Sequence, residues 1–342
     1  MVLHFVKGNL LSADTEALVN TVNTVGVMGK GIALQFKQAF PDNFKEYKKA
    51  CNKGMVSPGK MFIYENHSLS NPKYIINFPT KRHWKSMSKM QDIKDGLKAF
   101  REDLINLNIK SVSLPPLGCG NGGLEWSEVK PLITSSLEDL HDVDIYIYEP
   151  TGSPEPEKIP IRTNKPKMTK ARALLILLME QYTVPGYKLS LLEIQKLAYL
   201  LQEVGEPLKL NYVKYTYGPY AENLNHVLIR LDGHFIRGYG DRNRHSQISL
   251  SADAPTLARK FIENDEESIK RLQKVKELIS GFETPYGMEL ISSVHWANKH
   301  GHIPLNQPSK IVEFVQQWNE RKKLIFKESH ILKTINHLKS SI

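Results

Sequence analysis

The stretch Asn20-Thr-Val-Asn-Thr-Val-Gly26-Val-Met-Gly29-Lys-Gly31-Ile-Ala33 determines the fold expected for the first half of the chain. It lies between a strand predicted at 17–19 and an amphipathic helix predicted to end at Pro41. A second glycine-rich stretch, Pro115-Pro-Leu-Gly118-Cys-Gly120-Asn-Gly122-Gly123-Leu124, follows another strand. Clustered glycines let backbone N–H groups approach an anion, and a helix N-terminus favours negative charge. Two such loops at the carboxyl ends of parallel strands predict a phosphate-binding cleft.

Strand-like and helix-like segments alternate around these two glycine loops. The predicted strands are 3–6 and 17–19, both expected to be buried, together with 74–78, 111–114 and 143–148. Helical apolar spacing covers 32–40, 93–104 and 128–140. This alternation predicts an α/β fold in which helices cover both faces of a largely parallel sheet.

A proline-rich segment at 151–169 ends the alternation and predicts an extended linker. Beyond it the patterns are helical, beginning at 171–182 and with a capping box at Ser190-Leu-Leu-Glu193. Further helices are expected up to about Asp232 and near 268–279, 288–298 and 311–323. The chain should therefore form two domains, 1–150 and a mainly α-helical 170–342.

The composition bounds the class of protein. Of 342 residues, 41% are hydrophobic and 24% are charged, which is typical of globular proteins. The longest apolar run, 173–179, is too short to cross a bilayer, and the N-terminus has no export pattern. With only Cys51 and Cys119, neither a disulfide scaffold nor a thiolate zinc site is expected. We expect a cytoplasmic protein with no membrane partner, no metal and no cofactor.

The positive charge is concentrated in the second half. Residues 1–150 hold 18 Lys and Arg against 16 Asp and Glu, a net +2, whereas 151–342 hold 28 against 20, a net +8. A basic domain suggests a polyanion or an acidic partner. Scattered lysines on solvated helix faces are a simpler explanation of the same charge.

Four separated motifs of the first half resemble the macrodomain family. They are 8–11, 19–23, 26–33 and 116–124. Phe78-Pro-Thr-Lys81 with His83-Trp84 is similar to the branch that contains terminal ADP-ribose protein glycohydrolase and the DarG-type antitoxins. The resemblance covers roughly residues 1–150. It implies a three-layer α/β/α fold with a mostly parallel mixed sheet, and ADP-ribose as ligand or product.

The second half carries a shorter resemblance. Residues 192–201 followed by Tyr217-Gly-Pro219 are similar to the Panacea, or SocA-like, antitoxin domain. The resemblance implies that 170–342 bind and inhibit a DarT-type toxin, an NAD-dependent DNA ADP-ribosyltransferase. The candidate surface is the tyrosine cluster 212–220, although core packing explains some of these rings equally well. A domain that imitated DNA would be acidic, so the net +8 favours an acidic partner surface or DNA itself.

The macrodomain resemblance also implies which residues bind ADP-ribose. Asn9 stands where the family has an acidic side chain for the adenine amino group; its carbonyl oxygen could accept instead, or Asn9 could only shape a turn. Asn23 would bind the distal ribose, and Asn20 would brace the loop. The other expected ADP-ribose-binding residues are Gly8, Leu10, Gly29, Lys30, Gly31, Ile32, Thr80, Pro116, Leu117, Gly118, Cys119, Gly120, Asn121, Gly122, Gly123 and Leu124.

Lys81 is the expected catalytic residue, because the lysine of this motif is essential in the glycohydrolase branch. Its ammonium group could donate to the departing thymine base or stabilise the negative charge that develops. Alternatively, a neutral amine could attack the sugar and form a transient adduct. The second route needs a lowered lysine pKa, for which Arg82 and Lys85 are the candidate cations.

Position 122 bears on the substrate. The protein-directed branch pairs its lysine with an aspartate there, whereas this chain, like DarG-type sequences, has Gly122. We expect this glycine to widen the cleft for ADP-ribose attached to thymidine in single-stranded DNA. His83 and Trp84 are candidates for contact with that DNA, although Trp84 could equally anchor its loop. Cys119 is expected to pack as a small residue and not to act as a nucleophile.

Two other functions fit the same residues. One is a non-catalytic module that binds ADP-ribose, which would need the glycine loops but not Lys81. The other is an antitoxin that acts only by binding its toxin through the second domain.

Overall fold

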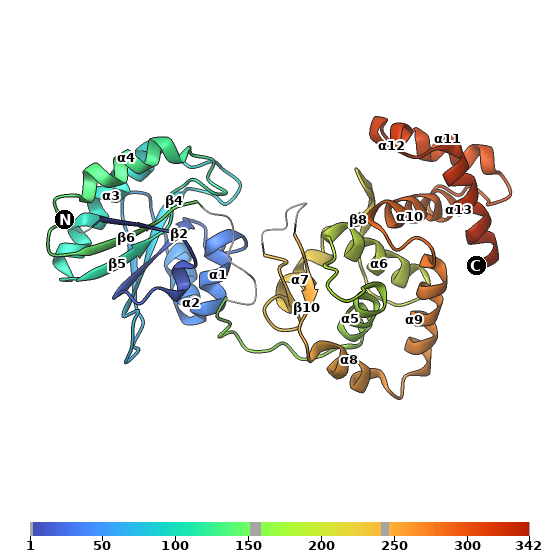
Figure 1. The fold of residues 1–342 in the computed structure, drawn as a ribbon, viewed down its shortest axis with the longest axis horizontal. Coiled ribbons are helices and arrows are strands. Elements are labelled where there is room, and N and C mark those ends of the chain that lie inside the picture. The colour runs from blue at the N-terminus through green and yellow to red at the C-terminus, as the bar shows by residue number, and fades with distance from the viewer. Residues whose placement is uncertain (1–2, 151–158, 241–245, 342) are drawn as a thin grey trace. The chain divides into compact units, whose positions relative to one another are not determined.

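The computed structural model describes residues 3–150, 159–240 and 246–341, and the chain divides into two compact units, 1–164 and 165–342 (Figure 1). The division falls within the predicted linker, of which 151–158 lie outside the described residues. Beyond that gap, the Arg162 N–H donates to the Gln38 carbonyl at 2.8 Å, and its guanidinium lies over the Phe40 ring. This part of the predicted linker therefore packs on the first unit.

A six-stranded sheet forms the centre of the first unit, in the order β1-β6-β5-β2-β4-β3. Its strands are β1 (Leu3–Val6), β2 (Ala17–Asn23), β3 (Phe62–Glu65), β4 (Tyr74–Lys81), β5 (Ser111–Leu114) and β6 (Asp144–Tyr148). Every neighbouring pair is parallel except β3 and β4. The predicted mostly parallel sheet is confirmed.

Helices cover both faces of this sheet, as predicted. One face packs against α3 (Met90–Asn106) and α4 (Trp126–Leu137), and the other against α1 (Gly31–Ala39), α2 (Pro41–Asn52) and the short 3-10 helix η1 (Leu10–Ser12). Val19 belongs to the first of these cores and its neighbour Leu18 to the second. Such alternation is expected of a strand buried on both sides, where each fully buried side chain contributes about 1.5–3 kcal/mol.

Several local predictions for the first unit are wrong. The strand at 3–6 is not buried: His4 and Phe5 are exposed, because β1 is an edge strand that pairs only with β6. The helix predicted to end at Pro41 does end before it, at Ala39, but Pro41 also begins α2, a helix that was not predicted, at a position that needs no N–H donor. β2 and β4 continue beyond their apolar cores to Asn23 and Lys81, since each strand is the other's pairing partner. The antiparallel strand β3 was not predicted at all.

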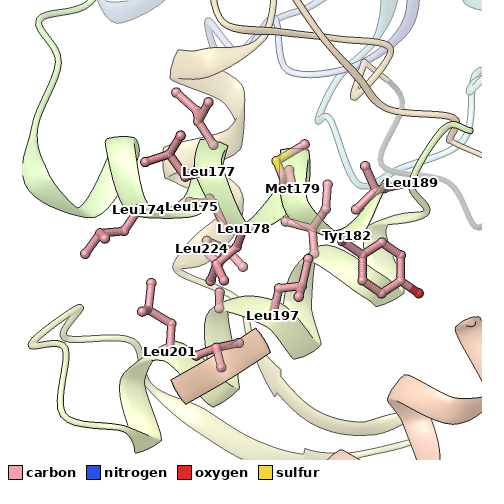
Figure 2. Packing of buried hydrophobic residues seen from close by; sticks show 14 of the residues in the cluster. Leu174, Leu175, Leu177, Leu178, Met179, Tyr182, Leu189, Leu197, Leu201 and Leu224 are labelled. Carbon is pink, nitrogen blue, oxygen red and sulfur yellow. The ribbon is translucent and has the colours of Figure 1, made fainter. Parts of the chain in front are cut away.

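The second unit is mainly helical, as predicted. Its helices are α5 (Lys170–Tyr182), α6 (Leu191–Glu203), α7 (Leu224–Leu231), α8 (Ala254–Ile262), α9 (Glu266–Ile279), α10 (Pro285–Lys299), α11 (Pro308–Gln316), α12 (Glu320–Ile325) and α13 (Glu328–Ser341). Two antiparallel ladders pair β7 (Tyr212–Tyr215) with β8 (Gly218–Ala221) and β9 (Ile236–Arg237) with β10 (Ser249–Leu250). Figure 2 shows leucines of α5 packed against those of α6 and α7. Throughout the described ranges, no helix is long and apolar enough to cross a membrane.

The predicted capping box is present at the start of α6, but two other details differ. The single helix expected at 311–323 is two helices, because the Asn319 side chain caps α12 and the Trp318 indole donates to the Tyr215 carbonyl at 2.8 Å. The tyrosine cluster forms the hairpin β7–β8. Core packing and a binding surface were the two roles predicted for this cluster, and different members fit each. Tyr212 packs edge-on against the core ring of Tyr199, whereas Tyr215 is 57% exposed.

Two lysines are buried where α6, α10 and α12 meet. The Lys322 ammonium donates to Glu289 Oε1 at 2.6 Å, whereas Lys196 donates to the Pro219 carbonyl, also at 2.6 Å. Burial, followed by the Lys322 charge, lowers the pKa of Lys196 to about 7. Lys196 is therefore a buried amine whose proton is held weakly in the folded chain.

We predict that Lys196→Met reduces the pH dependence of stability. Between about pH 7 and 10, Lys196 is neutral when folded but protonated when unfolded, so unfolding takes up a proton and the free energy of unfolding rises with pH. In the variant, the free energy of unfolding should rise less steeply, by up to about 1.4 kcal/mol less per pH unit. Urea titrations across this range measure the slope. The exposed Lys270→Met is the control, and an identical slope in wild type and Lys196→Met would contradict the prediction.

Candidate active site

The predicted site residues gather at one edge of the sheet. β2 and β4 are parallel neighbours whose register pairs Asn23 with Lys81, so the first glycine loop leaves the sheet beside Lys81. β5 pairs with the other side of β2 and leads at Pro115 into the second glycine loop. Because all three parallel strands end at the same edge, both loops and Lys81 converge there.

Asn23 holds the first glycine loop in shape. Its Oδ1 accepts from the N–H groups of Val25 and Val27 at 3.0 and 3.3 Å, and its Nδ2 donates to the Val27 carbonyl at 2.5 Å. The Tyr47 hydroxyl on α2 donates to the Asn23 backbone carbonyl at 2.5 Å. Asn23 thus organises the loop, and its contact with the distal ribose stays a prediction.

Asn20 lies beneath the same loop and is fully buried. Its Nδ2 donates to Asn77 Oδ1 at 3.0 Å, and Asn77 Nδ2 donates in turn to Asn43 Oδ1 at 2.7 Å. This network joins β2, β4 and α2. It agrees with the bracing role expected for Asn20, whereas the roles of Asn77, Asn43 and Tyr47 were not predicted.

Asn9 shapes the turn after β1, which was one of its two expected roles. Its Oδ1 accepts from the Leu11 N–H at 3.1 Å and so caps η1, within which Leu10 is buried. Contact between Asn9 and adenine stays a prediction.

The second glycine loop closes on itself. The N–H groups of Leu124 and Gly123 donate to the carbonyls of Gly118 and Gly120, both at 3.1 Å. A Cβ at position 122 would lie 2.1 Å from the Gly118 carbonyl oxygen and 2.4 Å from Ser88 Oγ. The expectation that Gly122 widens the cleft is therefore wrong: the loop's own backbone and Ser88 fill that space. At Gly120, by contrast, an added Cβ meets nothing within 4 Å.

The remaining predicted binding residues lie on or next to these two loops. Lys30 is the N-cap residue of α1, Ile32 is half-buried in its first turn, and Thr80 is buried immediately before Lys81. The others are Gly8 before η1, Gly29 and Gly31 on either side of Lys30, and Pro116, Leu117, Cys119 and Asn121 in the second loop.

Lys81, the last residue of β4, interacts with both loops. It is half-buried, and its ammonium donates to the Asn121 carbonyl of the second loop. Burial and then the charge of Lys30, in the first loop, lower the pKa of Lys81. The cations expected from sequence are engaged elsewhere: Arg82 pairs with Asp92 at 3.0 Å, and Lys85 lies 4.9 Å above the Trp84 ring. The cation that acts on Lys81 is thus Lys30.

An aromatic and basic surface follows Lys81. The His83 and Trp84 rings stack with centroids 5.5 Å apart, and Trp84 is 47% exposed. The Thr24 hydroxyl donates to the Arg82 carbonyl at 2.6 Å, which ties this segment to the first glycine loop. Exposed rings beside cationic side chains can stack on nucleic-acid bases, and contact of His83 and Trp84 with DNA stays a prediction.

Cys119 does not have the environment of a nucleophile. Burial and then the nearby Glu125 raise the pKa of the Cys119 thiol to about 11, which disfavours the reactive thiolate. Within the parts of the chain that the structure describes, no group of three or more His, Cys, Asp or Glu side chains could hold a metal ion.

Comparison with known proteins agrees with this geometry. Residues 19–133 match the family described as Macro domain. A DNA ADP-ribosyl glycohydrolase of Thermus aquaticus is 48% identical over 330 residues, which cover 96% of this chain and 91% of that protein. A DNA ADP-ribosyl transferase-DNA ADP-ribosyl glycohydrolase fusion protein of Thermosipho africanus is 39% identical over 163 residues, 43% of this chain and 42% of that protein. The solved macrodomain of Mycobacterium tuberculosis DarG is 53% identical, covers 44% of this chain and 99% of that chain, and superposes with a TM-score of 0.44.

The first unit, with its three layers and two glycine loops at one sheet edge, is a macrodomain. At 48% identity over almost its whole length, the chain belongs to the family of DNA ADP-ribosyl glycohydrolases. The macrodomain and DarG-type resemblance of the sequence is thereby confirmed, while the Panacea-like resemblance of the second half stays a prediction.

We predict that Lys30→Ala raises the pKa of Lys81 toward its ordinary value, because it removes the cation that disfavours the protonated amine. Lys30→Arg keeps the charge and should leave that pKa lowered. NMR titration of the Lys81 side chain in selectively labelled protein measures both. If Ala and Arg at position 30 gave the same Lys81 pKa as wild type, the Lys30 charge would have no role.

Proposed function

We propose that this chain hydrolyses the bond that joins ADP-ribose to thymidine bases of single-stranded DNA and so reverses a DarT-type toxin. The observation that carries the proposal is Lys81, a half-buried amine of lowered pKa placed between two glycine loops. The Thermus aquaticus relative is a DNA ADP-ribosyl glycohydrolase, which supports the same reaction. Hydrolysis of such a bond needs water and no cofactor. A DNA substrate also fits the reducing cytoplasm, the compartment expected because the chain has only two cysteines, both free.

In the proposed mechanism, the two loops hold the diphosphate and the distal ribose through backbone N–H groups. This places the anomeric carbon near Lys81. A lowered pKa serves both candidate routes: it makes the ammonium a stronger acid toward the departing base, and it increases the fraction of neutral amine able to attack the sugar. Gly122 also contributes. A carboxylate at this position would favour the protonated form of Lys81, and glycine provides none.

The surface next to Lys81 supports DNA as the carrier of the ADP-ribose. Trp84 and His83 present exposed rings, and Lys85 adds a cation beside them. Stacking of one base on such a ring contributes about 1–3 kcal/mol and tolerates different sequences. An ADP-ribosylated base held in the cleft would leave its neighbours in the strand within reach of this surface.

We predict that Lys81→Ala slows release of ADP-ribose from a modified thymidine oligonucleotide by about 10²- to 10⁴-fold, the usual contribution of one acid, base or nucleophile. Affinity for free ADP-ribose should persist, since the loops supply it. Lys81→Arg separates the routes, because a guanidinium can stabilise charge but cannot form the adduct. The exposed Lys98→Ala on α3, away from both loops and from the Trp84 surface, serves as the control. Equal rates for wild type and Lys81→Ala would exclude the catalytic role, and binding without release in both would identify a non-catalytic ADP-ribose module.

The second unit is proposed to bind and inhibit the toxin directly. In the Thermosipho africanus relative, a DNA ADP-ribosyl transferase and a glycohydrolase are fused in one chain, which supports a transferase as the partner. The hairpin β7–β8 offers the exposed Val213 and Tyr215, with Lys214 between them, as a surface for an acidic partner.

We predict that the full-length Lys81→Ala chain still suppresses DNA modification by the toxin when both proteins are present in equal amounts. Direct inhibition needs the second unit and not the amine of the first. The assay follows incorporation of ADP-ribose into an oligonucleotide by the transferase. Full modification in the presence of this variant would remove direct inhibition and leave enzymatic reversal as the sole antitoxin activity.

A further inference from the structure

Ser88 lies against the second glycine loop and has no assigned role. It is 7% exposed, and its N–H donates to the Gly122 carbonyl at 2.9 Å. Its hydroxyl points at the same loop: an added Cβ would come within 2.4 Å of Ser88 Oγ at position 122 and within 3.3 Å at position 118. Ser88 therefore occupies the space that a side chain at position 122 would need.

The Ser88 hydroxyl is buried without a hydrogen-bond partner. A buried hydroxyl without a partner costs free energy. A second state of the loop in which this hydroxyl is paired would therefore be favoured in this respect. The candidate partner is the carbonyl of Asn121, the residue directly before Gly122 in this loop, which accepts from Lys81 in this structure. While that contact exists, the Lys81 amine is engaged with the loop.

We propose that Ser88 is a positioning residue for the second glycine loop, and that its hydroxyl donates to the Asn121 carbonyl when ADP-ribose occupies the cleft. Rotation of the peptide between Asn121 and Gly122 would move this carbonyl from Lys81 to Ser88. It would turn the Gly122 N–H toward the anionic ligand and free the amine for the distal sugar. Gly122 allows the rotation because it has no Cβ to strike Ser88 or Gly118. The inference rests on the proposed binding of ADP-ribose.

The matched control is Ser113, a serine of the same unit that is also buried. Its hydroxyl is paired, accepting from the Thr15 hydroxyl at 3.1 Å, and it lies in β5 before the loop begins. Ser88→Ala and Ser113→Ala thus remove the same atom, in one case an unpaired hydroxyl beside the loop and in the other a paired hydroxyl within the sheet.

The test measures thermal stability and ADP-ribose affinity of the full chain by calorimetry. Ser88→Ala should weaken ADP-ribose binding roughly 3- to 10-fold, the effect of one hydrogen bond, without lowering the unfolding midpoint. Ser113→Ala should lower the midpoint and leave the affinity unchanged. Wild-type affinity in Ser88→Ala, or a loss of affinity accompanied by a loss of stability, would overturn the positioning role alone. Absence of ADP-ribose binding by the wild type would instead overturn the proposed function.

Discussion

The parallel pairing of β2 with β4 is the constraint on which the site depends. This ladder sets Asn23 opposite Lys81, so the origin of the first glycine loop and the end of β4 are adjacent. A one-residue shift in register would turn each side chain of a strand to the other face of the sheet and would break the asparagine network between Asn20 and Asn77. Strands buried on both faces resist such a shift, because their apolar side chains have no solvated alternative.

Features set by local chemistry could be predicted from the sequence. Apolar periodicity located most helices, the glycine clusters located both loops, and the Ser190–Glu193 capping box fixed the start of α6. The motif around Lys81 identified the candidate catalytic amine for the same reason: spacing and residue type are visible in a linear chain. Interactions between distant segments were not visible. The extension of β4 to Lys81 follows from pairing with β2, and the exposure of β1 follows from its place at the sheet edge.

The error over the cations has the same origin. Arg82 and Lys85 are close to Lys81 along the chain, yet Asp92 on α3 and the Trp84 ring engage them. Lys30 is 51 positions away and acts on Lys81 because the first loop leaves the sheet beside the end of β4. At Gly122, the absent side chain was expected to leave free volume in the cleft. The backbone of the second loop and Ser88 occupy that volume, so the loop in this conformation has no space for a side chain at position 122.

The position of Lys30 and the lack of space at position 122 together affect the protonation of Lys81. A carboxylate beside a lysine favours its protonated form and raises its pKa, whereas a second cation and burial favour the neutral amine. The closed second loop leaves no space at position 122 for an acidic side chain, since even a Cβ would meet the Gly118 carbonyl. Burial and Lys30 therefore act on Lys81 without an opposing carboxylate from that position. The backbone path of one loop thus helps set the protonation of an amine that belongs to another strand, which ties the reactivity of the site to the fold itself.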